Sequence, residues 1–152
     1  MTEIQKIVQL FDELQQGDCW IGFNMKDVLT GVDPKTAVYK PDPGGNSIWQ
    51  LVNHLAFWRN TVMLRLQGKD AYPEGADFYL PEIHDEAAWK NTLQEFTDTY
   101  TNFRKAILAF DETQLNGPSP KPEQTNYKLL MGCLQHDCYH MGQMVLLKKS
   151  SV

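Results

Sequence analysis

Two histidines near the C-terminal end of the chain have the side-chain type and the spacing of a metal-binding pair. His136 and His140 lie four residues apart in the stretch LLMGCLQHDCYHMGQMVLLKK, which otherwise follows an apolar helical pattern. On a helix this spacing places the two Cβ atoms on one face, ~5–6 Å apart, so both imidazoles can reach a single ion at bonds of ~2.1 Å. The same spacing also fits two hydrogen-bonded histidines in a packed core, so the pair alone does not decide between the two.

A third histidine favours the metal site. His54 lies within NSIWQLVNHLAFWRNTVMLRLQG, on the face that the apolar periodicity predicts to be buried. Buried imidazoles side by side are unfavourable, because each nitrogen needs a partner and a charge on one ring opposes a charge on the next. A shared cation removes this difficulty, and three inward histidines from two helices would form a site with an open position for water or substrate.

Three polar neighbours in the last helical stretch are candidates for supporting roles. Cys133, one turn before His136, is interpreted as a small buried hydrophobic residue; if it bound the ion instead, the site would be closed and structural. Gln143, one turn beyond His140, either orients a ligand or a water or lies on the helix surface. Asp137 is displaced from the face of the histidines toward a neighbouring helix, where a structural or outer hydrogen bond is expected. No acid on this face is a candidate general base.

The remaining histidine and the tryptophans are expected to lie outside the site. His84 precedes two acids at the start of a helix, where a surface or capping role is expected. The aromatic-rich stretch YPEGADFYLPE either covers the mouth of the metal site or packs as an irregular segment. The tryptophans are expected in the core or at an interface, with a dimer contact built on one of them: Trp20, Trp49, Trp58 and Trp89.

Four amphipathic helical stretches must position these side chains. The first begins with a capping box at residues 2–5, is broken at 17–18 and restarts over 24–31. The others span 47–68, 85–110 and about 125–149, and Pro- and Gly-rich connections separate them over 32–46, 69–84 and 116–124. With no alternating β pattern, the sequence predicts one all-α domain over residues 1–152, a four-helix bundle with long irregular connections and a broken first helix.

Composition and charge narrow the expected partners and compartment. The net charge is −5 and the basic residues are scattered, so binding to nucleic acid, which needs a cationic patch, is not expected. No apolar run approaches the ~18 residues of a membrane span, and the amphipathic N-terminal stretch differs from a secretory signal. The three cysteines, Cys19, Cys133 and Cys138, form no CxxC pair, which favours reduced thiols in the cytoplasm over disulfides.

The stretches SIWQLVNHLAFW and LQHDCYHMGQMVLLKK together resemble the DinB-like superfamily of four-helix-bundle metalloproteins. The resemblance covers almost the whole chain, and its specific part is one histidine in the second helix with His-x-x-x-His-x-x-Gln in the fourth. It implies that His54, His136 and His140 hold one divalent transition metal, zinc or nickel, and that the protein is a homodimer. It also implies parallel second and third helices, which would explain the long connection from Lys69 to Ile83.

We therefore expect a divalent-metal-binding protein with an open three-histidine site. Three neutral ligands leave the positive charge of the ion in place to lower the pKa of a bound thiol or water. The leading hypothesis is a metal-dependent transferase or hydrolase acting on a small-molecule substrate, and the low-molecular-weight thiol in it follows only from the resemblance, since some members of the superfamily use one. The alternatives are a non-catalytic, stress-related metal-binding protein and a helical interaction module without a metal.

Overall fold

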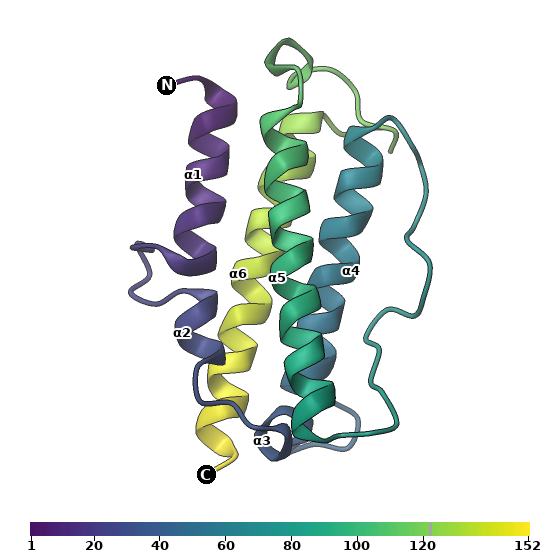
Figure 1. The fold of residues 1–152 in the computed structure, drawn as a ribbon. Helices are drawn as coiled ribbons and strands as arrows, with labels where there is room; N and C mark the ends of the chain where they lie inside the picture. The colour runs from purple at the N-terminus through teal and green to yellow at the C-terminus, as the bar shows by residue number, and fades with distance from the viewer. Residues whose placement is uncertain (122) are drawn as a thin grey trace.

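The structure is a computed structural model that describes residues 1–121 and 123–152, and its helices form the predicted all-α bundle (Figure 1). Extended pairing within these residues is limited to an isolated bridge between Pro118 and Thr125. None of the helices in this part of the chain is long and apolar enough to span a bilayer. The helices are α1 (Glu3–Gln16), α2 (Met25–Leu29), α3 (Pro34–Val38), α4 (Ile48–Leu66), α5 (Glu86–Leu108) and α6 (Asn126–Ser150), with one 3₁₀ turn, η1 (Glu112–Gln114).

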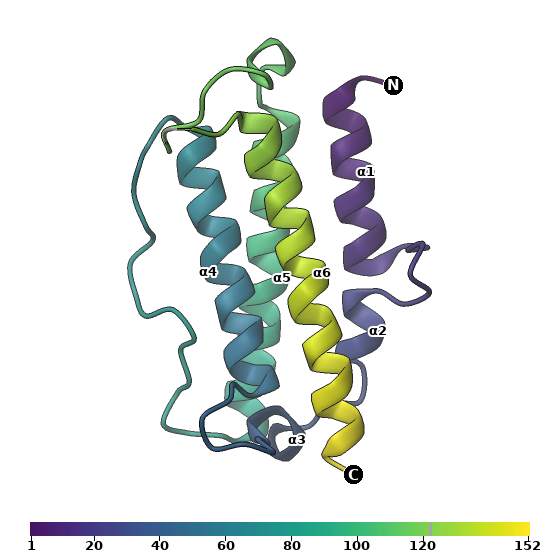
Figure 2. The ribbon, with the colours of Figure 1, turned by 180° about the vertical axis from the view of Figure 1, so that it is seen from behind.

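The long helices run in two directions through the bundle. α4 and α5 run parallel to each other, and α1 and α6 run the opposite way (Figures 1 and 2). Because α5 begins at the same end of the bundle as α4, the chain must return along the whole length between them. Residues 67–85, which we call the strap, make this return along the outside of α4 (Figure 1). The expected parallel order is confirmed, and it explains the length of the connection.

The predicted break in the first helical element is confirmed, and Asn24 stabilises it. The Oδ1 atom of Asn24 accepts a hydrogen bond from the amide of Asp27 at the start of α2, while its Nδ2 donates to the carbonyl of Gly17 just after α1. One side chain thereby satisfies backbone groups at the ends of two helices. α2 ends at Leu29, and Gly31 follows with a φ of 76°, in the left-handed region that glycine adopts readily.

The prediction that residues 32–46 are wholly irregular is wrong. α3 forms there because Pro34 occupies the start of a helix, where its missing N–H is not needed, and Asp33 accepts a hydrogen bond from the amide of Thr36 at 2.7 Å. The three longest helices lie within two residues of their predicted ends. A capping box over residues 47–50 starts α4, which carries His54, within one residue of its predicted start.

Two of the four tryptophans lie in the core, near the end of the bundle that α3 covers. Trp49 and Trp89 pack with ring centroids 4.9 Å apart, and both indole N–H groups donate hydrogen bonds to buried partners. Trp58 is half-buried beside the histidines, and Trp20 is 96 % exposed in the loop between α1 and α2. The expected core position therefore holds for Trp49 and Trp89, while Trp20 lies on the surface of this chain.

Candidate metal centre

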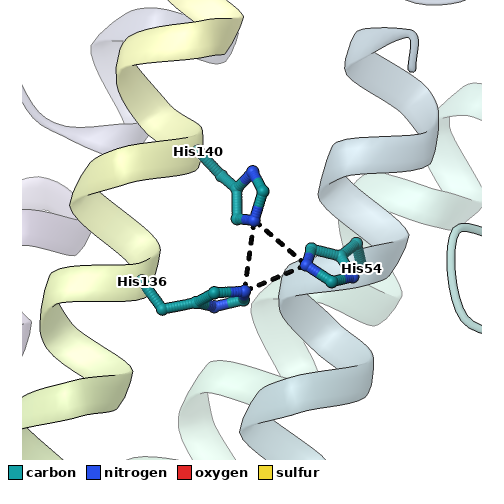
Figure 3. Close-up of side chains that lie close together, drawn as sticks. All are labelled: His54, His136 and His140. Carbon is teal, nitrogen blue, oxygen red and sulfur yellow. Dashed lines mark hydrogen bonds between the residues drawn. The ribbon is translucent and has the colours of Figure 1, made fainter. Parts of the chain in front are cut away.

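The packing of α4 against α6 brings the three predicted histidines together (Figure 3). His54 comes from α4, and His136 and His140 come from successive turns of α6. Their Nε2 atoms form a small triangle, in which His54 lies 2.9 Å from His136 and 3.0 Å from His140, and the last two are 3.1 Å apart. The ligand atoms of this cluster are close enough together to hold a metal ion.

An acid from the strap fixes the orientation of His54. Nδ1 of His54 lies 2.6 Å from Oδ1 of Asp77, and the other carboxylate oxygen of Asp77 accepts a hydrogen bond from the indole of Trp58 at 3.2 Å. Hydrogen bonds of this kind orient a metal-binding imidazole and raise its basicity. Helical periodicity could not identify Asp77 as a site residue, because Asp77 lies in an irregular segment. The only indication in the sequence was its place within the aromatic-rich stretch YPEGADFYLPE.

The strap covers one face of His54. The ring of Phe78 stacks on the imidazole with centroids 3.8 Å apart and an interplanar angle of 11°. Side chains of α4 hold this segment, since Gln50 donates to the carbonyl of Phe78 and Asn53 donates to the carbonyl of Tyr79. Phe78 has a φ of 53°, a conformation unfavourable for a bulky residue that these contacts must maintain.

The predicted neighbour Gln143 contacts His140. Nδ1 of His140 lies 2.6 Å from Oε1 of Gln143, and the amide nitrogen of Gln143 donates to the hydroxyl of Tyr139 at 3.4 Å. A hydrogen bond to the ring nitrogen that faces away from the triangle holds the ring in place and leaves Nε2 free. Two of the three histidines are therefore oriented from behind, one by a carboxylate and one by an amide.

These partners determine which nitrogens carry protons. A carboxylate and an amide oxygen only accept hydrogen bonds, so Nδ1 of His54 and Nδ1 of His140 both carry the hydrogen. In the neutral rings, both Nε2 atoms then present lone pairs to each other at 3.0 Å. If Nε2 of His136 carries a hydrogen, this single N–H must be shared between the two lone pairs. A cation in contact with all three nitrogens would satisfy them together.

Protonation of the rings is an unfavourable way to resolve this conflict. Burial and the charges of the neighbouring histidines lower the pKa of His136 to about 4, and burial lowers the pKa of His140 as well. His54 and His140 are only 5 % and 8 % exposed. At neutral pH, His136 and His140 are accordingly uncharged, and the neutral imidazole is the form that binds metal ions.

The size of the triangle fits a first-row transition metal. With sides of about 3 Å, the three nitrogens could all reach a single ion at bonds of ~2.1 Å. Imidazole ligands suit Zn²⁺, Ni²⁺, Co²⁺ and Cu²⁺. Three histidine ligands would leave a coordination position for water or substrate, as in catalytic rather than closed structural zinc sites.

The other sequence candidates lie around the triangle without joining it. Cys133 is buried and does not belong to the cluster of ligand atoms, which fits the small buried hydrophobic residue expected, and burial raises the pKa of its thiol. Asp137 is fully buried and accepts hydrogen bonds from the guanidinium of Arg59, which is the structural role expected of it. His84 is exposed and contacts the carbonyl of Pro81, outside the site as predicted.

A cleft of about 320 Å³ opens beside the triangle between α4 and α6. His54 and His136 both line it, together with Cys133 and Trp58. A larger groove, of about 1090 Å³, lies along α1 and α5, and no histidine lines it. Chemistry at the histidines would therefore use the smaller cleft, whose volume is that of a small-molecule site.

Asp77→Ala is expected to weaken metal binding by about 10- to 100-fold, because His54 loses the carboxylate that orients its ring. Asp77→Asn keeps an acceptor but removes the charge, so its metal affinity is expected to lie between those of Asp77→Ala and the wild type. Zinc affinity by competition with a chromophoric chelator measures the change. Glu74→Ala is the matched control, since it removes an exposed acid from the same strap. Equal affinities for Asp77→Ala and Glu74→Ala would contradict the role given to Asp77.

Comparison with known proteins agrees with this geometry. A family model described as the DinB superfamily matches residues 24–144, a range that contains all three histidines and the strap. A search of curated proteins found no match for the chain. The family match spans most of the sequence, and the bundle and the histidine cluster are those expected from the resemblance. The chain belongs to the DinB superfamily.

Proposed function

We propose that this protein is a metal-dependent enzyme in which His54, His136 and His140 hold one divalent ion, zinc or nickel. The observation that carries the proposal is the convergence of three Nε2 atoms within 3.1 Å of one another, with two of them fixed as lone-pair donors by Asp77 and Gln143. Such a set of nitrogens is poorly satisfied by hydrogen bonds and well satisfied by a cation.

When bound, the ion would supply a positive charge that lowers the pKa of a thiol or water beside it toward neutrality. The protein's own residues supply position and shielding. Asp77 and Gln143 hold two of the rings, and Phe78 covers the face of His54 against water. The carboxylate of Asp77 already contacts both His54 and Trp58, so its role is to position the imidazole.

The substrate class in this proposal is a low-molecular-weight thiol, with water as the second possibility. The thiol comes from the resemblance to superfamily members that use one, and the cleft beside the histidines has room for a small molecule. The proposal includes a cytoplasmic location, supported by three cysteines that are all free. It also includes a homodimer, to which the exposed Trp20 could contribute a contact.

The test joins metal analysis to a turnover screen. The protein is purified without an affinity tag that binds metals, its zinc and nickel contents are measured, and it is then assayed with several cellular thiols against a chlorinated and a brominated electrophile. We expect about one ion per chain, turnover that is lost on chelation and regained on adding metal, and no regain in His140→Ala. Stoichiometric metal without turnover on any thiol or by hydrolysis would support the non-catalytic alternative. Absence of stoichiometric metal would overturn the proposal.

A further inference from the structure

The cleft beside the histidines has an apolar middle and a cationic far end. Because α4 and α6 run in opposite directions (Figure 2), residues late in α4 lie beside residues early in α6. The cleft is lined by His54 and His136 and also by Arg65 and Lys128, so it extends from the histidines toward these two cations. Its walls between these ends are formed mainly by an indole, two aliphatic side chains and a glycine, which are Trp58, Val62, Leu129 and Gly132.

Arg65 is an unusual residue within this cleft. It is only 5 % exposed, yet its side chain donates no hydrogen bond to any described residue, and its Nε and Nη2 atoms are buried without an acceptor. The guanidinium lies 5.7 Å from the ring of Trp58 and 5.6 Å from the ring of Tyr72. Contacts with two aromatic rings offset part of the cost of burying the charge, but they leave the N–H donors unsatisfied.

Arg59, one and a half turns earlier on the same helix, shows how this bundle treats a buried arginine that is purely structural. Its guanidinium forms an ion pair with Asp137 at 3.0 Å and donates a hydrogen bond to Gln15. Nη1 of Arg59 is also buried without an acceptor, so the difference from Arg65 is the counter-ion. No described acid forms such a pair with Arg65, and Asp77 of the strap is engaged by His54 and Trp58. Arg65 therefore carries a charge without a protein counter-ion at the wall of a cleft.

We propose that Arg65, together with the exposed Lys128, binds an anionic group of the substrate, a carboxylate or a phosphate, while the reactive end of the same molecule lies at the histidines. A guanidinium recognises either anion through paired N–H donors, and an ammonium adds a second, mobile charge. The side chain of a helical residue leans toward the N-terminus of its helix, so Arg65 reaches back toward His54, and its contact with Trp58 agrees with that direction. The position of the reactive end rests on the proposed function; the anion site itself does not.

The distance along α4 limits the shape of such a substrate. Eleven residues separate His54 from Arg65, which corresponds to ~16 Å between their Cα atoms at 1.5 Å per residue. Even with the side chain leaning back, the anionic group and the reactive group must be several bonds apart. The apolar walls between them favour a spacer that is largely uncharged.

The test compares two thiols that differ only in charge. Protein loaded with Co²⁺ is titrated with 6-mercaptohexanoate and with 6-mercaptohexan-1-ol, and binding is followed by the charge-transfer absorption between thiolate and cobalt. We expect the acid to bind at least about tenfold more tightly than the alcohol in the wild type. Arg65→Gln is expected to remove this preference by weakening only the acid, and Lys128→Gln, an exposed substitution that cannot unfold the core, is expected to reduce it. Arg104→Gln, outside the cleft, is the control and keeps the preference.

A second arm keeps the anion site separate from the thiol hypothesis. Metal-free protein is titrated with hexanoate and with hexyl phosphate by saturation-transfer NMR. If either anion binds the wild type and this binding is lost in Arg65→Gln, the anion site is supported. Failure of both thiols to bind cobalt would then count only against the thiol as substrate. The tighter of the two anions identifies the group that is recognised. Equal binding of the acid and the alcohol by the wild type, or a preference that survives in Arg65→Gln and Lys128→Gln, would overturn the inference.

Discussion

Replacing His54, His136 or His140 by alanine is expected to lower the affinity for zinc and nickel by more than about a hundredfold, because loss of a mere orienting partner already costs about 10- to 100-fold and each variant loses a whole ligand. His54→Ala also has a cost in folding stability, since it leaves the carboxylate of Asp77 without its closest partner. Isothermal titration with each metal, extended by chelator competition for the wild type, measures the change.

The fourth histidine provides a matched control for this prediction. His84 is exposed and lies outside the triangle, so His84→Ala is expected to bind metal as the wild type does. Thermal unfolding supplies a readout that needs no activity. A metal concentration of about 100 times Kd should stabilise the wild type and His84→Ala by ~2.7 kcal/mol, and this gain should disappear in the three triad variants. A triad variant that kept both the affinity and the stabilisation would remove that histidine from the site.

The helices that carry the triad could be predicted from local signals. The capping box at Ser47 and the apolar stripe of α4 placed His54 on an inner face, and the spacing of His136 and His140 placed both on one face of α6. These signals act within one or two helical turns, so a single sequence displays them. That α4 and α5 run in parallel followed from the family resemblance, since periodicity says nothing about direction.

The contribution of the strap could not be predicted in the same way. Asp77 reaches His54 because side chains of α4, such as Asn53, hold the strap through its backbone carbonyls. These are contacts between segments far apart in the sequence, and an irregular segment has no periodicity that would indicate which residue points inward. The same limit applies to Trp20, whose size favours burial but which lies at the tip of a loop and is almost fully exposed.

Arg59→Met is expected to destabilise the fold by about 3–5 kcal/mol, because it leaves the carboxylate of Asp137 buried without its ion-pair partner. Arg59 is fully buried, and its guanidinium also lies 4.7 Å from the ring centroid of Phe96 and 5.2 Å from that of Tyr100, so packing is lost along with the charge. Urea unfolding of the metal-free protein measures the loss without a contribution from bound metal.

The double variant Arg59→Met/Asp137→Leu separates the ion pair from simple packing. Replacing both members of a buried pair by apolar residues is often close to neutral, so the double variant should be more stable than Arg59→Met alone. A double variant less stable than Arg59→Met would show that the cost of the single change is lost packing rather than an unpaired carboxylate.

The pair also joins the two helices that bear the metal ligands. Arg59 follows His54 on α4, and Asp137 is adjacent to His136 on α6, so this ion pair fixes the two helices in register beside the triangle. If that register matters for the site, metal affinity should fall in Arg59→Met and should stay below the wild type in the double variant even when its stability has recovered. Wild-type affinity in a stable double variant would instead show that apolar packing of α4 against α6 is enough to hold the three nitrogens within 3.1 Å of one another.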